Sequence, residues 1–265
     1  MEARLRVRRF DPESGEGARY QSYALEVPDY ATVLEVLLQI REELDDSLAL
    51  RCSCSSAICG SCAMRINGQA RLACKTKVAT LAADSEEIVV EPVGNMPVIK
   101  DLVADMDPFW QKVRAVEPWI QPKGPPPERE YLVPHEVMRP LADVMACIMC
   151  GSCVSDCTVL ETELSLGKPY EQTFLAPAAL AKAYRFVGDP RDGADAERLA
   201  ALSRLEGIWD CTRCNFCVEV CPKGVAPMDQ ILALRRKAIE QGYDEYLGAR
   251  HTLEFEKTVR ESSWL

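Results

Sequence analysis

The stretch Cys54-Ser-Ser-Ala-Ile-Cys59-Gly-Ser-Cys62 places three cysteines in one short loop, and Cys74 follows as a fourth. Small residues lie between these cysteines, so backbone N–H groups can approach the sulfur atoms. This spacing is typical of a [2Fe–2S] cluster, whose two irons need four thiolates. A tight loop would supply three of them and the next hairpin the fourth. A four-cysteine zinc site, the alternative, usually shows two short cysteine pairs instead.

Cys52 lies two residues before Cys54 and does not fit this spacing. If Cys52 replaced Cys54 as a ligand, the loop would be two residues longer. We therefore expect a spare thiol beside the cluster. The other interpretation is that Cys52 is an alternative ligand.

The residues around this loop predict a small α+β domain. Polar and apolar residues alternate in Arg4–Phe10 and Tyr20–Val27, as they do in strands, and Thr32–Leu44 has helical spacing. Met64–Cys74 reads as a hairpin around Asn67-Gly68, and Glu87–Val93 as a further strand. We expect residues 1–105 to form a plant-type ferredoxin (β-grasp) domain, and Val98–Trp110 to be a helix that packs between two domains.

Two later cysteine groups repeat one another in spacing. They are Cys147-x2-Cys150-x2-Cys153-x3-Cys157 and Cys211-x2-Cys214-x2-Cys217-x3-Cys221-Pro222. This is the run of bacterial two-cluster ferredoxins, in which the fourth cysteine of each run binds the other cluster. The pattern predicts one [4Fe–4S] cluster on Cys147, Cys150, Cys153 and Cys221, and another on Cys211, Cys214, Cys217 and Cys157. Two separate zinc sites would explain the spacing less well.

Proline content and helical spacing suggest where the second domain begins. A length of 265 residues is enough for about two domains. Five prolines between Pro118 and Pro127 resist both helix and strand, so we place a connection at residues 106–130. Pro177–Phe186, Ala194–Leu205 and Met228–Gln241 have helical composition, which predicts an all-α domain with two clusters at residues 131–250. Residues 251–265 would form a C-terminal tail.

Composition excludes several function classes. The net charge of −10 argues against nucleic-acid binding, and no apolar run is long enough to span a bilayer. Thirteen cysteines, an odd number, follow an N-terminus without a signal peptide, which favours metal binding over disulfides. His135 and His251 are far in sequence from every cysteine group, and no catalytic triad or phosphate loop is present. The sequence therefore predicts an electron carrier without a substrate site of its own.

These motifs together resemble one family, the iron–sulfur subunits of succinate dehydrogenase and fumarate reductase. The resemblance covers about residues 3 to 245 and also rests on Pro97-Val-Ile-Lys-Asp-Leu-Val103. It implies an oxidoreductase complex in which a separate flavoprotein subunit carries FAD. Electrons would pass from it through three clusters to a membrane-anchor subunit and quinone. It also implies a peripheral location at the cytoplasmic face of the membrane.

The resemblance implies a role for each cysteine group. Cys54, Cys59, Cys62 and Cys74 would form the entry centre; Cys147, Cys150, Cys153 and Cys221 the middle one; and Cys157, Cys211 and Cys217 would bind the third. Most members lack a cysteine at the position of Cys214 and hold a [3Fe–4S] third cluster. Cys214 favours a [4Fe–4S] cluster of lower potential here, whereas an unligated Cys214 would leave a [3Fe–4S] cluster.

The sequence departs from the family pattern at the quinone site. Thr158 follows Cys157 where many members have proline, and no tryptophan follows as far as Thr162. Thr212 stands after Cys211, where a histidine is common. The usual quinone-site residues of this subunit are therefore missing, which leaves the direct acceptor open.

Two further hypotheses come from other classes of function. One is a related iron–sulfur subunit that exchanges electrons with a thiol–disulfide module, although the chain has none of the Cys-Cys-Gly motifs common in such relatives. The other is a zinc-stabilised interaction protein. Basic residues near the first cysteine group suggest either a docking surface for the flavoprotein or a solvated face; they are Arg51, Arg65, Arg71, Lys75 and Lys77.

Overall fold

The computed structural model describes residues 1–83, 85–204 and 206–262, which divide into two compact units. The first unit consists of Met1–Phe109, Cys147–Cys157 and Glu219–Lys223. The second consists of Trp110–Ala146, Thr158–Val218 and the chain from Gly224 onward. Two cysteine-bearing segments from the second half of the chain thus fold with the first unit.

A five-stranded mixed sheet forms the first unit, with strand order β2-β1-β5-β3-β4. The strands are β1 (Glu2–Arg9), β2 (Arg19–Glu26), β3 (Ala63–Ile66), β4 (Gln69–Leu72) and β5 (Ile88–Glu91). β1 pairs antiparallel with β2 and parallel with β5, and β3 pairs antiparallel with both β4 and β5. Leu5 and Val7 of β1 are fully buried, as their alternation predicts.

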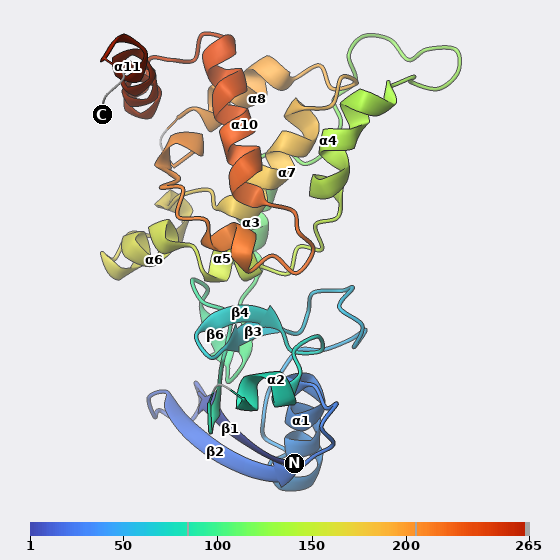
Figure 1. Ribbon diagram of the computed structural model, residues 1–265, viewed down its shortest axis with the longest axis vertical. Helices are drawn as coiled ribbons and strands as arrows, with labels where there is room; N and C mark the ends of the chain where they lie inside the picture. The colour runs from blue at the N-terminus through green and yellow to red at the C-terminus, as the bar shows by residue number, and fades with distance from the viewer. Residues whose placement is uncertain (84, 205, 263–265) are drawn as a thin grey trace. The chain divides into compact units, whose positions relative to one another are not determined.

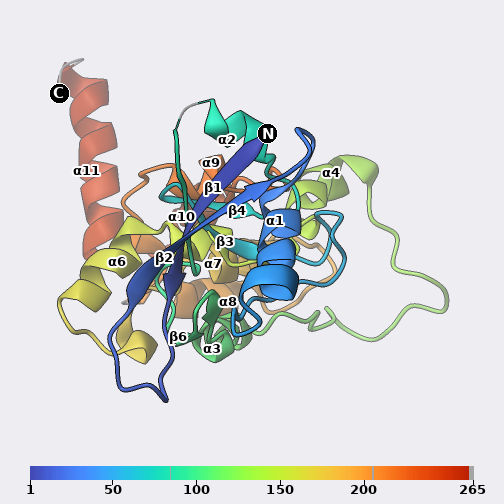
Figure 2. The same cartoon turned by 90° about the horizontal axis from the view of Figure 1, so that it is seen from below.

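Helix α1 (Val33–Gln39) covers the core of this unit and runs on into a π-helical turn, Ile40–Leu44. It begins at Thr32, whose side chain and that of Glu35 form a reciprocal capping box. Val33, Leu37 and Ile40 recur on one face and are fully buried. Both views show α1 beside the long β1–β2 ribbon (Figures 1 and 2).

The β3–β4 hairpin turns at Asn67-Gly68, as the sequence predicts. Both residues have positive φ, +51° and +77°, which a tight two-residue hairpin turn requires. The two strands continue beyond the ladder, where Ala73 N–H donates to the Cys62 carbonyl at 3.1 Å. The hairpin therefore brings the chain around Cys62 and Cys74 together.

The expected helix over Val98–Trp110 was wrong. The structure has β6 (Val98–Lys100) and β7 (Val103–Ala104), and α3 begins only at Asp107 and ends at Ala115. Asp101 lies at the turn with φ +45° and is buried. Its carboxylate accepts hydrogen bonds from Arg9 Nε (3.0 Å), Phe10 N (2.9 Å) and Ala49 N (2.9 Å). These contacts with distant residues hold the segment in a hairpin. A second short helix, α2 (Val78–Ala82), follows β4 and was not expected.

The second unit is helical. Its longer helices are α4 (His135–Met145), α6 (Thr158–Ser165), α7 (Pro177–Val187), α8 (Asp195–Leu202), α10 (Pro227–Glu240) and α11 (Leu247–Ser262). α10 packs against α7 and α8, and Leu180, Leu199 and Ile231 are fully buried there. Short helical turns occur at Tyr170–Gln172 (η2) and Ile208–Asp210 (η3). Among the described residues, no helix has both the length and the apolar character needed to span a bilayer.

Candidate iron–sulfur sites

The loop of the first cysteine group directs backbone N–H groups at sulfur atoms. Three of them point at Cys54 Sγ, from Ser56 (3.4 Å), Ile58 (3.4 Å) and Cys59 (3.3 Å). Ala57 N–H points at Cys74 Sγ at 3.3 Å. Such donors stabilise negative charge on sulfur, as a cluster held by thiolates requires.

A left-handed backbone makes this arrangement possible. Ser55 and Ala57 have φ near +50°, at +51° and +56°, and Gly60 has φ +76°. Left-handed positions among right-handed ones turn successive N–H groups toward one side and create an anion-binding concavity. A non-glycine residue in this region is strained by roughly 1 kcal/mol, and such strain is concentrated at functional sites.

The four thiols of the first group interact with one another but differ in environment. Hydrogen bonds with Ser61 and then with Cys54 lower the pKa of Cys59, which is exposed, to about 6. Burial is the main reason that the pKa of Cys62 is raised to about 12. A ligand thiol must lose its proton when metal binds. The pKa shifts therefore favour loss of the proton at exposed Cys59 and oppose it at buried Cys62.

The second and third cysteine groups repeat the same local backbone. In the second, Met149 (φ +54°) and Gly151 (φ +81°) are left-handed, and the short helix α5 (Ser152–Ser155) follows at once. In the third, Arg213 (φ +62°) and Asn215 (φ +73°) occupy the corresponding positions, and α9 (Phe216–Glu219) follows. The repeat in spacing is therefore also a repeat in conformation.

Hydrogen bonds anchor the Cys147–Cys157 segment within the first unit. Asn95 Nδ2 donates to the carbonyls of Val154 (2.9 Å), Ser155 (3.1 Å) and Cys157 (2.9 Å). Asp156 accepts from Ala70 N–H of β4 at 2.9 Å. The segment is thus fixed beside the hairpin that carries Cys62 and Cys74.

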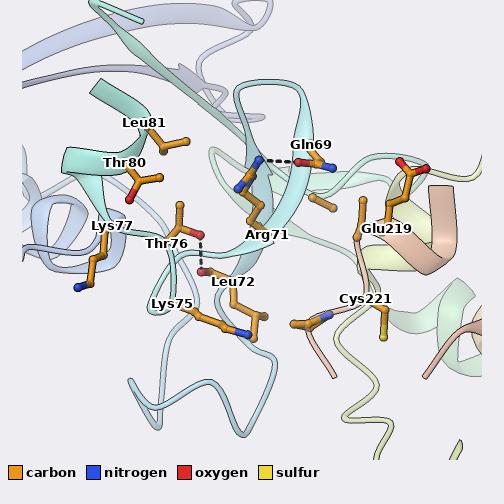
Figure 3. A pocket seen from close by; sticks show the side chains of 13 residues that line it. Gln69, Arg71, Leu72, Lys75, Thr76, Lys77, Thr80, Leu81, Glu219 and Cys221 are labelled. Carbon is orange, nitrogen blue, oxygen red and sulfur yellow. Dashed lines mark hydrogen bonds between the residues drawn. The ribbon is translucent and has the colours of Figure 1, made fainter. Parts of the chain in front are cut away.

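Cys221 lies in the same unit and lines a cleft of about 420 Å³ (Figure 3). The other lining residues are Gln69–Leu72, Lys75–Lys77, Thr80, Leu81, Glu219, Val220 and Pro222. Three of the five basic residues noted in the sequence, Arg71, Lys75 and Lys77, lie here. Arg51 and Arg65 instead donate to the Ala104 and Gly68 carbonyls, at 2.7 and 2.9 Å. The segment of Cys221 therefore runs beside the chain that follows β4.

In the second unit, Arg235 of α10 holds the chain that enters the third group. Its guanidinium donates to the carbonyls of Ile208 (2.8 Å), Trp209 (3.1 Å) and Cys211 (2.7 Å). Arg235 is 8% exposed and lies over the Trp209 ring, 5.4 Å from its centre. Burial lowers its pKa, which the charge of Cys211 partly offsets. A buried cation thus lies next to one proposed ligand.

The structure places the cysteines in loops or turns, except Cys153 and Cys217, which lie within the short helices α5 and α9. The first group is assembled in the first unit, together with the Cys147–Cys157 segment and Cys221, whereas Cys211, Cys214 and Cys217 belong to the second unit. Cys214 is exposed and Cys217 is buried. The described residues contain no three His, Cys, Asp or Glu placed to share a single metal ion. Sequence reasoning missed Asn95 and Arg235, since single polar residues far from the cysteines carry no motif.

Two family models cover the stretches of chain that contain the cysteine groups. A family model described as a 2Fe-2S iron-sulfur cluster binding domain matches residues 4–111, and one described as a 4Fe-4S dicluster domain matches residues 143–225. The succinate dehydrogenase iron-sulfur subunit of Paracoccus denitrificans is 33% identical over 239 residues, which are 90% of this chain and 88% of that protein. The chain belongs to the family of succinate dehydrogenase and fumarate reductase iron–sulfur subunits.

Other members of the family agree in sequence and fold. The fumarate reductase iron-sulfur subunit of Mycobacterium tuberculosis is 35% identical over 86% of this chain and 89% of its own length. A solved chain of the Mycobacterium smegmatis Sdh1 complex in the apo form superimposes with a TM-score of 0.81 at 27% identity, and covers 93% of this chain and 99% of its own. The predicted α+β fold and the family are confirmed. This iron–sulfur subunit is an electron-transfer component of an oxidoreductase complex.

Proposed function

We propose that this iron–sulfur subunit transfers electrons from a FAD-containing flavoprotein subunit to a membrane-anchor subunit and quinone. It would act as a peripheral member of a succinate dehydrogenase or fumarate reductase complex. The observation that supports this best is the match of the chain, over about nine tenths of its length, to subunits of such complexes. When bound, the clusters supply one-electron transfer, and the chain's own residues hold and space them.

The ligand sets follow from the cysteine groups. Cys54, Cys59, Cys62 and Cys74 would hold the [2Fe–2S] cluster, because four N–H groups already point at two of these sulfurs. Cys147, Cys150, Cys153 and Cys221 would hold the middle [4Fe–4S] cluster, and all four belong to the first unit. These sets keep the crossed pattern of two-cluster ferredoxins.

The third cluster would use Cys157, Cys211, Cys214 and Cys217. Left-handed residues flank Cys214 at Arg213 and Asn215, as Met149 and Gly151 flank Cys150 in the second group. Because the local backbone is the same, we infer that Cys214 binds iron as Cys150 does. A [4Fe–4S] third cluster is therefore favoured over a [3Fe–4S] one.

Electron paramagnetic resonance (EPR) of the air-oxidised complex tests the function and the third cluster together. An oxidised [3Fe–4S] centre gives a signal, whereas oxidised [2Fe–2S] and [4Fe–4S] centres are silent. We expect silence and about ten irons per chain with matching acid-labile sulfide. A strong oxidised signal with about nine irons per chain would leave Cys214 without iron. A colourless chain that binds zinc and no sulfide would refute the proposed function.

A further inference from the structure

Two glycines of the first unit lie directly against the Cys147–Cys157 segment. At Gly60, which is buried, a Cβ atom would lie 2.8 Å from Cys150 Cβ and 3.0 Å from Cys150 Cα. At Gly94, a Cβ atom would lie 2.7 Å from the Ser155 carbonyl oxygen. Close-packed atoms do not approach to such distances, so any side chain at either position must push the segment away.

These contacts join the environments of two proposed clusters. Gly60 follows Cys59 in the [2Fe–2S] loop, and Cys150 is a proposed ligand of the middle [4Fe–4S] cluster. Gly60 of that loop therefore packs directly against this ligand. Gly94 lies next to Asn95, whose three hydrogen bonds hold the far end of the same segment. The Cys147–Cys157 segment is thus in direct contact with the rest of the first unit both at Cys150 and at Ser155.

We infer that Gly60 and Gly94 are positioning residues that set the spacing between the [2Fe–2S] and the middle [4Fe–4S] centres. The inference rests on the ligand sets of the proposed function. Electron tunnelling falls exponentially with distance, and the magnetic coupling of two paramagnetic centres falls with its cube. A small outward shift of the segment therefore weakens both quantities, although each cluster keeps its own ligands.

Alanine variants with matched controls separate spacing from backbone strain. Gly60→Ala adds a contact with Cys150 and the strain of a side chain at φ +76°. Gly68→Ala adds the same strain at φ +77° but meets nothing within 4 Å. Gly94→Ala adds a contact without a left-handed φ, and Gly17→Ala, in open space, is its control.

The test uses the purified complex with its flavoprotein. Iron per chain is counted, the magnetic coupling of the two reduced centres is read from EPR relaxation, and electron transfer between them is timed after flash reduction. We expect Gly60→Ala and Gly94→Ala to keep both cluster signals, while the coupling weakens and the transfer slows severalfold. The Gly68→Ala and Gly17→Ala complexes should match the unmodified one.

Unchanged coupling and rate in iron-replete Gly60→Ala and Gly94→Ala complexes would overturn the inference. If Gly60→Ala alone loses its [2Fe–2S] signal, the Gly94→Ala complex tests the inference instead, because this substitution leaves the [2Fe–2S] loop unchanged. Iron loss from both variants would also overturn it, since the glycines would then serve assembly of the clusters. Failure of the ligand sets would show differently, as loss of a [4Fe–4S] signal when Cys59 is replaced.

Discussion

At the scale of single residues, Cys59 and Cys52 are the two cysteines whose replacement tests the proposed ligand set of the [2Fe–2S] cluster. Cys59 is exposed, its pKa is lowered to about 6, and it interacts with Cys54. Cys52 is half-buried and lies outside the spacing. We predict that Cys59→Ser abolishes or shifts the EPR signal of the reduced [2Fe–2S] centre and leaves both other clusters intact.

Cys52→Ser is the matched control, and all cluster signals should survive it. The two variants make the same chemical change seven positions apart on the chain. Loss of the [2Fe–2S] signal in Cys52→Ser, with retention in Cys59→Ser, would make Cys52 the ligand instead.

Cys214 carries the second prediction at this scale. Replacing it with serine should remove one iron per chain and create an oxidised EPR signal, because a cubane without its fourth thiolate readily becomes a [3Fe–4S] centre. The potential of that centre should rise, since cluster type and charge set the potential. Redox titration followed by EPR measures both effects. An unchanged spectrum would show that Cys214 binds no iron.

The spacing of the cysteines predicts the cysteine groups, but it does not predict which other residues hold these groups in place. A cluster needs several thiolates at set intervals, so its signal is local and repeated in the chain. Asn95 and Arg235 act through backbone carbonyls, and any residue can supply a carbonyl. Nothing in the sequence around them reveals that contact. The ligand sets themselves stay a prediction until the variants above are measured.

At the scale of elements, Arg198 of α8 holds the chain between α3 and α4 in place through buried hydrogen bonds. It is 5% exposed, pairs with Asp192 at 3.2 Å, and donates to the carbonyls of Val116, Glu117 and Trp119. Removing one partner of a buried pair leaves the other charge uncompensated. We predict that Arg198→Met lowers the free energy of unfolding by about 3 kcal/mol.

Denaturant unfolding of the iron-loaded chain measures this change. Arg204→Met is the control, because Arg204 is exposed, and it should alter the free energy of unfolding by less than about 0.5 kcal/mol. Equal effects of the two substitutions would show that the buried network contributes nothing specific.

Lys112 of α3 links stability to pH. Burial lowers its pKa to about 8 from an ordinary value of 10.5, although its ammonium group donates to the Thr173 and Phe174 carbonyls, each at 2.8 Å. Between these two values the unfolded chain binds more protons than the folded one, so stability rises with pH. We predict that Lys112 makes the denaturant midpoint of unfolding increase from pH 8 to 10 in the unmodified chain. The rise should be smaller in Lys112→Met, and equal slopes would contradict the shift.

Elements with local signals are the ones that the sequence predicts well. The capping box at Thr32 and the Asn67-Gly68 turn each specify a structure by nearby residues alone. The prediction of a helix over Val98–Trp110 failed because Asp101 takes its partners from Arg9 and Phe10 and from Ala49, far away in sequence. The folding of Cys147–Cys157 with the first unit also depends on distant partners, here Ala70 and Asn95. Tertiary contacts overrode local preference at these places.

At the scale of the whole molecule, the family and the cysteine groups indicate an electron carrier. Oxidation of succinate removes two electrons and two protons from carbon, so it needs a two-electron acceptor beside the substrate. Thiolate-held clusters accept electrons singly. The chain's two histidines, His135 and His251, are both exposed and begin or lie within separate helices, α4 and α11.

We therefore predict that the iron-loaded chain alone does not oxidise succinate, and that adding the flavoprotein subunit lets succinate reduce its [2Fe–2S] centre. Succinate-dependent dye reduction and the EPR signal of that centre measure the two halves of this prediction. The flavoprotein with a Cys59→Ser chain that has lost its [2Fe–2S] signal is the control, since it keeps the substrate site but lacks the entry centre. That mixture should still bleach a dye at the flavin, while electrons no longer reach the other clusters. Turnover by the pure chain, free of flavin, would mean that a substrate site lies on this subunit and would replace the carrier model with a catalytic one.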